Sequence, residues 1–146
     1  MHLSEKINIA EKDRFARLAG IRILEVSKGL ARTAMDISDC HRNALGMVHG
    51  GAIFTLADLA FALAANAEPD VTAVAVNVNI SYLKSSSKGV LYAEAREISV
   101  NRKIGTYAVT VTDETEAKIA FFRTVRDQIK GRIEGWLEKT LTDSQV

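Results

Sequence analysis

Several features that would point to particular protein classes are missing from this chain of 146 residues. Its one cysteine, Cys40, excludes an intrachain disulfide, and with three scattered histidines it makes no recognisable zinc site, so we expect no metal. The 19 basic and 18 acidic residues are spread along the chain, with no basic block to bind nucleic acid. Residues 1–15 have no apolar run of the secretory type, so we expect a cytoplasmic protein.

A long hydrophobic run is missing as well. The apolar stretch that comes closest covers residues 52–65, which is well short of the roughly 20 residues that a membrane span needs. It contains Asp58, the only charged side chain between Ala44 and Ala67. We therefore predict a core helix here and no membrane association. Because this helix is apolar on every side, a sheet would cover only part of it, and we expect a second copy of the chain to bury the rest.

No repeat, linker or low-complexity tract divides the chain, so we expect one domain over residues 1–146. Helical spacing predicts an amphipathic helix at 8–19, within an N-terminal helical segment of about 1–19, and a helical tail at about 127–146. The predicted fold class is α+β, with one long central helix wrapped by an antiparallel β-sheet. Alternating apolar residues between turn sequences predict its strands, at residues 21–28, 30–38, 73–82, 90–99, 106–113 and 117–126.

Asp58 stands on what we expect to be a buried helix, where an ionised carboxylate is costly unless it is paired, hydrogen-bonded or used in chemistry. Burial would raise its pKa and suit the carboxylate to act as a general base or a nucleophile. The alternative is a structural aspartate that accepts hydrogen bonds from nearby backbone or hydroxyl groups.

His49, Gly50 and Gly51 lie at the start of the same helix, where backbone N–H groups have no partner in the helix and the helix dipole is positive. Glycine lets a ligand approach this backbone, which suits the oxyanion of a carbonyl under attack. The alternative is that the glycines only allow close packing, that His49 is structural and that Asn43 only shapes a turn.

Together these residues form the pattern Asn43-x-x-Gly46-x-x-His49-Gly50-Gly51, followed by Asp58 within FTLADLAFALAAN. The pattern closely resembles that of the hotdog-fold acyl-CoA thioesterases of the phenylacetic-acid-degradation (PaaI-like) type. The resemblance continues through VNVNISYLKSSSKGVLYAEA and covers about residues 20–126. It implies a hotdog fold and the hydrolysis of an acyl-CoA, with an aryl-acetyl or medium-chain acyl group, to a free acid and coenzyme A. Coenzyme A is then part of the substrate, and no separate cofactor is expected.

The resemblance also implies roles for the residues that match the family's motif. Asp58 matches the general base or nucleophile, and the N–H of Gly50 matches the group that polarises the thioester carbonyl. Asn43 and His49 match residues that help to orient that carbonyl, and Gly51 lies beside them as a substrate-binding residue.

Two positions depart from the family's pattern. Relatives often carry Ser or Thr on the strand that faces the site, whereas here that face is expected to offer Ala75, Asn77 and Asn79, of which Asn79 is the first candidate. The usual proline after the Tyr-Leu-Lys stretch is replaced by Ser85. Basic residues in two loops are candidates to bind the phosphates of coenzyme A. They are Lys84, Lys88, Arg102 and Lys103. The alternative is that these side chains are only solvated loop charges.

Two other functions on the same fold remain open at this point. A non-catalytic acyl-CoA-binding protein would keep the glycine site but could lack the carboxylate. A hydratase or dehydratase would need a histidine placed for proton abstraction beside the acyl chain, whereas His49 lies at the helix start.

The spacing of Gly50 and Asp58 bears on the oligomeric state. Eight residues on one helix correspond to about 12 Å along its axis, too far for one aspartate side chain to bridge. An antiparallel helix from a second copy could bring its own Asp58 opposite Gly50. We therefore expect a homodimer with shared active sites, and the resemblance adds that such dimers often pair into tetramers.

Overall fold

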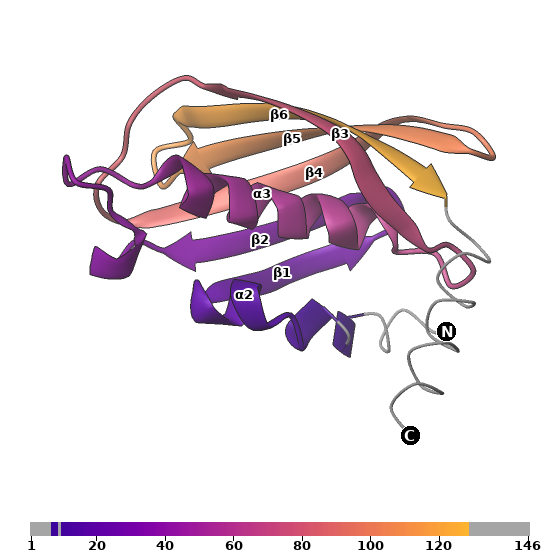
Figure 1. Ribbon diagram of the computed structural model, residues 1–146, viewed down its shortest axis with the longest axis horizontal. Helices are drawn as coiled ribbons and strands as arrows, with labels where there is room; N and C mark the ends of the chain where they lie inside the picture. Colours follow the sequence, from indigo (N-terminus) through magenta and orange to yellow (C-terminus); the bar gives the residue numbers. More distant parts are fainter. Residues whose placement is uncertain (1–6, 9, 129–146) are drawn as a thin grey trace, which may run out of the picture.

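The computed structural model describes residues 7–8 and 10–128, and these form a six-stranded antiparallel sheet with the long helix α3 lying across one face (Figure 1). The strand order in the sheet is β1-β2-β4-β5-β6-β3. The elements, in chain order, are α2 (Arg14–Leu18), β1 (Ile21–Ser27), β2 (Leu30–Asp36), the short 3₁₀ helix η1 (Asp39–His41), α3 (Gly50–Ala65), β3 (Ala73–Tyr82), β4 (Val90–Val100), β5 (Ile104–Asp113) and β6 (Lys118–Gln128).

The observed elements confirm the predicted α+β architecture, and each predicted strand is found within two residues of its expected bounds. The N-terminal helix at 8–19 is wrong as a single helix, because the helical residues 7–8 and 10–11 are followed by a break at Lys12 and Asp13. Asp13 caps α2 by accepting hydrogen bonds from the N–H groups of Phe15 and Ala16, a role that aspartate favours over a helix interior. The predicted tail at 127–146 lies outside the described residues, apart from the last two residues of β6.

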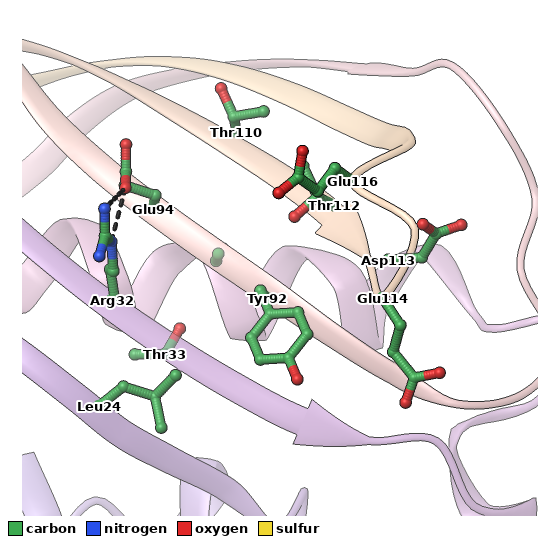
Figure 2. Close-up of a pocket in the computed structure, with 11 residues that line it drawn as sticks. Leu24, Arg32, Thr33, Tyr92, Glu94, Thr110, Thr112, Asp113, Glu114 and Glu116 are labelled. Atoms are coloured by element: carbon green, nitrogen blue, oxygen red, sulfur yellow. Dashed lines mark hydrogen bonds and ion pairs between the residues drawn. The ribbon is translucent and has the colours of Figure 1, made fainter.

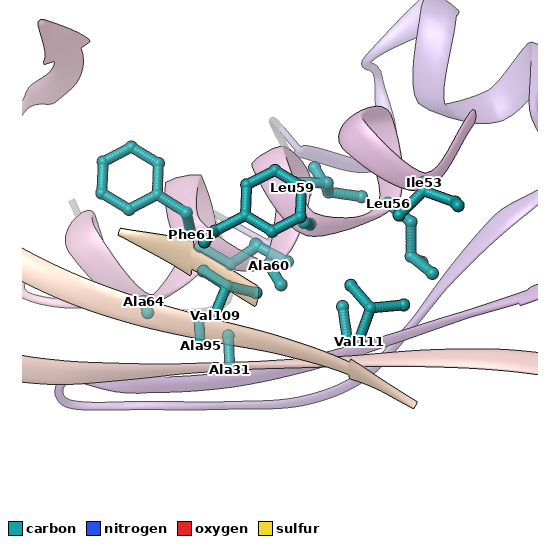
Figure 3. Close-up of a cluster of buried hydrophobic side chains, with 14 of the residues drawn as sticks. Ala31, Ile53, Leu56, Leu59, Ala60, Phe61, Ala64, Ala95, Val109 and Val111 are labelled. Atoms are coloured by element: carbon teal, nitrogen blue, oxygen red, sulfur yellow. The ribbon is translucent and has the colours of Figure 1, made fainter. Parts of the chain in front are cut away.

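Small side chains on the sheet let α3 pack closely against it. Ala31 on β2 and Ala95 on β4 are buried beneath the helix, which contributes Leu56, Ala60 and Phe61 (Figure 3). The buried hydroxyl of Thr33 donates a 3.0 Å hydrogen bond to the carbonyl oxygen of Leu56. This bond fixes the middle of α3 relative to β2, and so fixes the helix that carries both ends of the candidate site.

The sheet covers only part of the helix, as its apolar composition predicted. Gly51 and Asp58 are exposed, whereas Thr55 and Ala62 are half-buried. These four residues form one stripe of α3 that faces away from the sheet. Asp58 therefore lies on the open side of the helix. The short helix α2 lies beside β1 (Figure 1), and it lines a cavity with the part of this stripe around Asp58. In the described part of the chain, no helix has the length and apolar character needed to cross a membrane.

Strand β3 forms one edge of the sheet and pairs only with β6. The pairing shifts register between Ala75 and Asn77, so Val76 forms a bulge. Val74 and Val76 are 43% and 58% exposed, and one side of the strand's backbone has no neighbouring strand in the described chain. The bulge interrupts the alternation that the sequence suggested for the whole strand.

Candidate active site

The N-terminus of α3 has one backbone N–H group without a partner. His49 caps the helix, and its ring Nδ1 accepts a 2.8 Å hydrogen bond from the N–H of Gly51. The N–H groups of Ala52 and Ile53 both donate to the carbonyl oxygen of His49. Within the described residues, this leaves only the N–H of Gly50 free among the first four of the helix. The helix start therefore offers one well-defined donor, as an oxyanion site requires.

Gly50 is closely approached by Tyr82 at the end of β3. The Tyr82 hydroxyl donates a 3.1 Å hydrogen bond to the carbonyl oxygen of Gly50. A Cβ atom at Gly50 would lie 2.9 Å from the same hydroxyl oxygen, which is too close for an ordinary contact. Close packing, the alternative role of this glycine, is therefore realised here, together with its free N–H.

Asn43 organises the loop that leads to the helix. Its side-chain Oδ1 accepts hydrogen bonds from the N–H groups of Leu45 and Met47, at 2.9 and 3.2 Å. These bonds orient the amide so that its Nδ2 group, which bonds to no described residue, is left to donate. The loop is fixed at its far end by a 2.8 Å bond from the N–H of Val48 to the carbonyl oxygen of Ser86.

Asp58 lies in a cavity between α3 and α2. The cavity has a volume of about 220 Å³, and its apolar lining includes Phe15 from α2 with Phe54 and Leu59 from α3. Although Asp58 is exposed at the helix surface, these walls partly shield its carboxyl group from water. This burial, with a smaller contribution from the nearby carboxylate of Asp13, raises the pKa of Asp58 above its ordinary value of 3.8. The direction agrees with the prediction, and Asp13 is a cause that the sequence did not reveal.

A single chain does not bring Asp58 to Gly50. The cavity at Asp58 is lined by α2 and the middle of α3, and Gly50 is not among its residues. The eight residues between them correspond to about 12 Å along the helix axis. The two groups therefore belong to different ends of one surface stripe.

The structure corrects the expected orientation of β3. Paired residues of neighbouring strands point to the same side, and Val78 and Ile80 pair with the buried Thr124 and Phe122. They face α3, so Asn77 and Asn79 point away from the helix and do not lie beside Gly50 or Asp58 of the same chain. Tyr82 is the β3 residue that reaches the site, because it follows Ile80 by two positions.

The four candidate cations lie at two ends of the molecule. The loop that carries Lys84 and Lys88 contacts the end of α3 where Gly50 lies, through the bond between Val48 and Ser86. Lys84 is also 3.8 Å from Asp113. Arg102 and Lys103 lie in the turn between β4 and β5, next to Val100, which lines a cavity at the other end of α3. In one chain these two cations are therefore far from Gly50.

A broad hollow of about 630 Å³ lies on the sheet face opposite α3 (Figure 2). Its lining includes Tyr92, Thr110 and the ion pair of Arg32 with Glu94 at 2.6 Å. None of the residues singled out from the sequence lines it. Among residues 7–8 and 10–128, no three His, Cys, Asp or Glu side chains gather closely enough to hold a metal ion.

Comparison with known proteins decides the family, because the model of the thioesterase superfamily matches residues 45–120. The chain belongs to the thioesterase superfamily. The acyl-coenzyme A thioesterase PaaI of Escherichia coli is 32% identical over 126 residues, covering 86% of this chain and 89% of that protein. A candidate esterase of Archaeoglobus fulgidus is 40% identical over 111 residues, covering 75% of this chain and 71% of that protein.

Solved structures confirm the hotdog fold of this thioesterase. The PaaI protein from the phenylacetic acid degradation operon of E. coli superposes with a TM-score of 0.81 at 29% identity, covering 85% of this chain and 90% of that one. A Streptococcus mutans protein bound to acetyl CoA superposes with a TM-score of 0.70 at 27% identity, covering 74% of this chain and 87% of that one. The predicted enzyme class, a thioester hydrolase, is the class of this family.

Two residues of the site were not singled out from the sequence. Tyr82 carries a hydroxyl at a strand end, and the alternation places it on the same face as Val78 and Ile80, but nothing in the sequence singles it out as a site residue. Asp13 could have been found as a helix cap, because an aspartate before an apolar helical pattern is a typical N-cap. Neither signal shows that these residues lie next to Gly50 and Asp58, since both contacts are tertiary.

Proposed function

We propose that this thioesterase hydrolyses acyl-CoA thioesters with an aryl-acetyl or medium-chain acyl group. The observation that carries the proposal is the single free N–H at the start of α3, on Gly50, in the family's HGG position. An acyl-CoA substrate is supported by the PaaI relative, which is an acyl-coenzyme A thioesterase, and by the structural relative bound to acetyl CoA. The apolar cavity beside Asp58 suits an aromatic or aliphatic acyl group.

In the proposed reaction the thioester oxygen accepts the hydrogen bond of the Gly50 N–H, with the Asn43 amide as a further donor. Asp58 takes a proton from water as the water oxygen attacks the carbonyl carbon, or the carboxylate itself attacks and water then hydrolyses the mixed anhydride. Either route breaks the C–S bond and releases a carboxylic acid and the thiol of coenzyme A. The helix dipole stabilises the negative charge on the oxygen in both.

We further propose that each active site combines the Gly50 end of one subunit with Asp58 of another. The separation of about 12 Å on one helix supports this, because reacting groups must lie about 3 Å from the carbonyl. The exposed stripe of α3 and the outer edge of β3, which has no neighbouring strand among the described residues, are two surfaces that a second copy could contact. Arg102 and Lys103 would reach coenzyme A only from the partner, whereas Lys84 and Lys88 would come from the subunit that supplies Gly50.

The proposal is tested by incubating the purified protein with a panel of acyl-CoAs and measuring free thiol and double-bond formation separately. We expect thiol release with aryl-acetyl or medium-chain substrates. Tight binding without turnover would instead indicate an acyl-CoA-binding protein, and a change in double-bond content without thiol release would indicate a hydratase or dehydratase.

A further inference from the structure

Arg126 is a buried cation at the end of the molecule away from Gly50. It lies on the side of β6 that faces α3, and only 5% of its surface is exposed. Its side chain crosses Gly105, its partner on β5, where a Cβ atom would lie 2.5 Å from the Arg126 Nε. Gly105 therefore makes room for the arginine, and the sheet holds the guanidinium in the interior.

This guanidinium has unsatisfied donors. Among the described residues, neither Nε nor Nη1 of Arg126 has a hydrogen-bond partner, which leaves three buried N–H groups without an acceptor there. The Tyr107 ring lies 5.9 Å from the guanidinium carbon and offsets part of the cost. No carboxylate of the described residues lies within 4.0 Å of Arg126, and a buried charge without a partner is strongly unfavourable.

A cavity of about 210 Å³ adjoins Arg126 beneath the C-terminal end of α3. Small residues, Gly29, Ala64 and Ala65, form part of its wall and keep it open. Two carboxylates also line it, but both have partners at hand: Glu68 pairs with Lys28 at 2.5 Å, and Glu97 accepts a hydrogen bond from Tyr107 at 3.3 Å. Among the charges of this cavity that the structure describes, Glu97 and Arg126 have no ion pair, and only Arg126 has buried donors without a hydrogen-bond partner.

We propose that this cavity binds a small oxyanion, a carboxylate or a phosphate group, with Arg126 as its principal ligand. The unpaired Nη1 group supplies two donors, and guanidinium groups match carboxylate and phosphate oxygens in geometry and charge. The volume is ample for an anion of a few heavy atoms, because one water molecule takes about 30 Å³ in the liquid. The site is separate from the proposed hydrolytic site and does not depend on the function proposed above.

The experiment measures the thermal unfolding midpoint of the full chain in potassium phosphate, potassium acetate and potassium chloride at equal ionic strength. Wild type is expected to gain about 2–4 °C in 50 mM phosphate or acetate over chloride, as a ligand that binds only the folded state should give. Arg126→Met should lose this gain and, in chloride, should be at least as stable as wild type, because an unpaired buried charge is removed. General salt effects on stability act on both proteins alike.

The matched control is Arg123→Met on the same strand, whose side chain is exposed on the opposite face of the sheet and which should keep the gain. A gain with phosphate alone identifies a phosphate site, and a gain with acetate alone identifies a carboxylate site. Equal midpoints in all three salts, or an undiminished gain in Arg126→Met, would overturn the proposal.

A second measurement follows anion binding in the wild-type protein and needs a variant only to assign the Arg126 signal. Arginine side-chain Nε–H resonances of the isotope-labelled protein are followed while phosphate or acetate is added. The resonance that is absent from the spectrum of Arg126→Lys is assigned to Arg126. In the wild-type titration its chemical shift should change and reach a plateau as the anion saturates the site. A resonance that stays unchanged with both anions would refute binding at this cavity.

Discussion

At the scale of single residues, the proposed chemistry rests on the carboxyl group of Asp58, which an apolar cavity partly shields from water. The walls of the cavity between α2 and α3 raise the pKa of Asp58, and Asp13 raises it further because two negative charges repel. At a pH above its raised pKa, Asp58 is ionised and is a stronger base than an ordinary carboxylate. It also means that ionised Asp58 weakens the fold above its folded-state pKa, since the unfolded chain holds that charge more easily.

Replacing Asp58 by asparagine should therefore remove activity and keep the fold. We expect acyl-CoA hydrolysis to fall by about 10²–10⁴, because asparagine can neither accept a proton nor attack the carbonyl at neutral pH. The unfolding midpoint at pH 7 should be equal to or above that of wild type, since a poorly solvated charge is lost. Asp70→Asn, in the exposed loop before β3, is the control and should change neither quantity. Full turnover in Asp58→Asn would remove Asp58 from the mechanism.

The pH dependence of the rate should report the same group. As the pH falls, Asp58 becomes protonated and inactive, so the acid limb of kcat/KM should lie above 3.8, the ordinary value for its pKa. Asp13→Asn should move this limb to lower pH, because it removes a repelling charge while asparagine still caps α2. The measurement is a pH–rate profile of both proteins, and coincident acid limbs would show that Asp13 does not act on Asp58.

At the scale of elements, the end of β3 and the start of α3 form one unit through Tyr82 and Gly50. Gly50→Ala should destabilise the protein by about 1–3 kcal/mol, because its Cβ would meet the Tyr82 hydroxyl. Tyr82→Ala in the same chain should relieve most of that cost, which denaturant unfolding of both single variants and the double variant would measure. Strictly additive costs would mean that the glycine is not needed for this packing. If the double variant regains stability but not activity, Gly50 also serves to let the substrate approach the helix start.

The sequence predicted the elements better than their orientations. Alternation located the strands, because each strand keeps one face against α3, and the Asn43 to Asp58 pattern located the helix and its start. The alternation could not show the bulge at Val76, because a strand with one extra residue still reads as a regular run of valines. The bulge changes the side of the sheet to which Asn77 and Asn79 point. Likewise the apolar composition of α3 did not show which side of the helix the sheet covers, because alanines suit either side of a helix. The position of Asp58 opposite the sheet needed the structure.

At the scale of the whole molecule, the proposed shared site can be tested by mixing subunits. One subunit carries Asp58→Asn and the other is disabled by Asn43→Ala with Gly50→Ala. Each alone should be inactive, whereas hybrid dimers should regain one intact site. An equal mixture, unfolded and refolded together, should reach roughly a quarter of wild-type activity if subunits pair at random. A mixture as inactive as its parents, with hybrids confirmed by mass spectrometry, would place both groups of the site in one chain.

The assembly itself is a separate prediction. We expect light scattering on a sizing column to give the mass of a dimer or, if dimers pair, of a tetramer. Lys or Glu at position 76 on the exposed edge strand should reduce that mass and the activity together, whereas Leu45→Glu, in the exposed loop before α3, should leave the mass unchanged. A monomer with full activity would contradict the shared site.

The free edge of β3 also has a consequence for how this protein is made and stored. An edge strand with exposed valines, whose outer side has no neighbouring strand among the described residues, is a template on which further chains can add, in the manner of an amyloid-like stack. A subunit that has folded but not yet met its partner would therefore be at risk of aggregation. Formation of the proposed dimer would bury this edge and so protect the newly made chain. When the unfolded protein is refolded by slow dilution, we then expect more of it to be lost to aggregation than is recovered as folded protein.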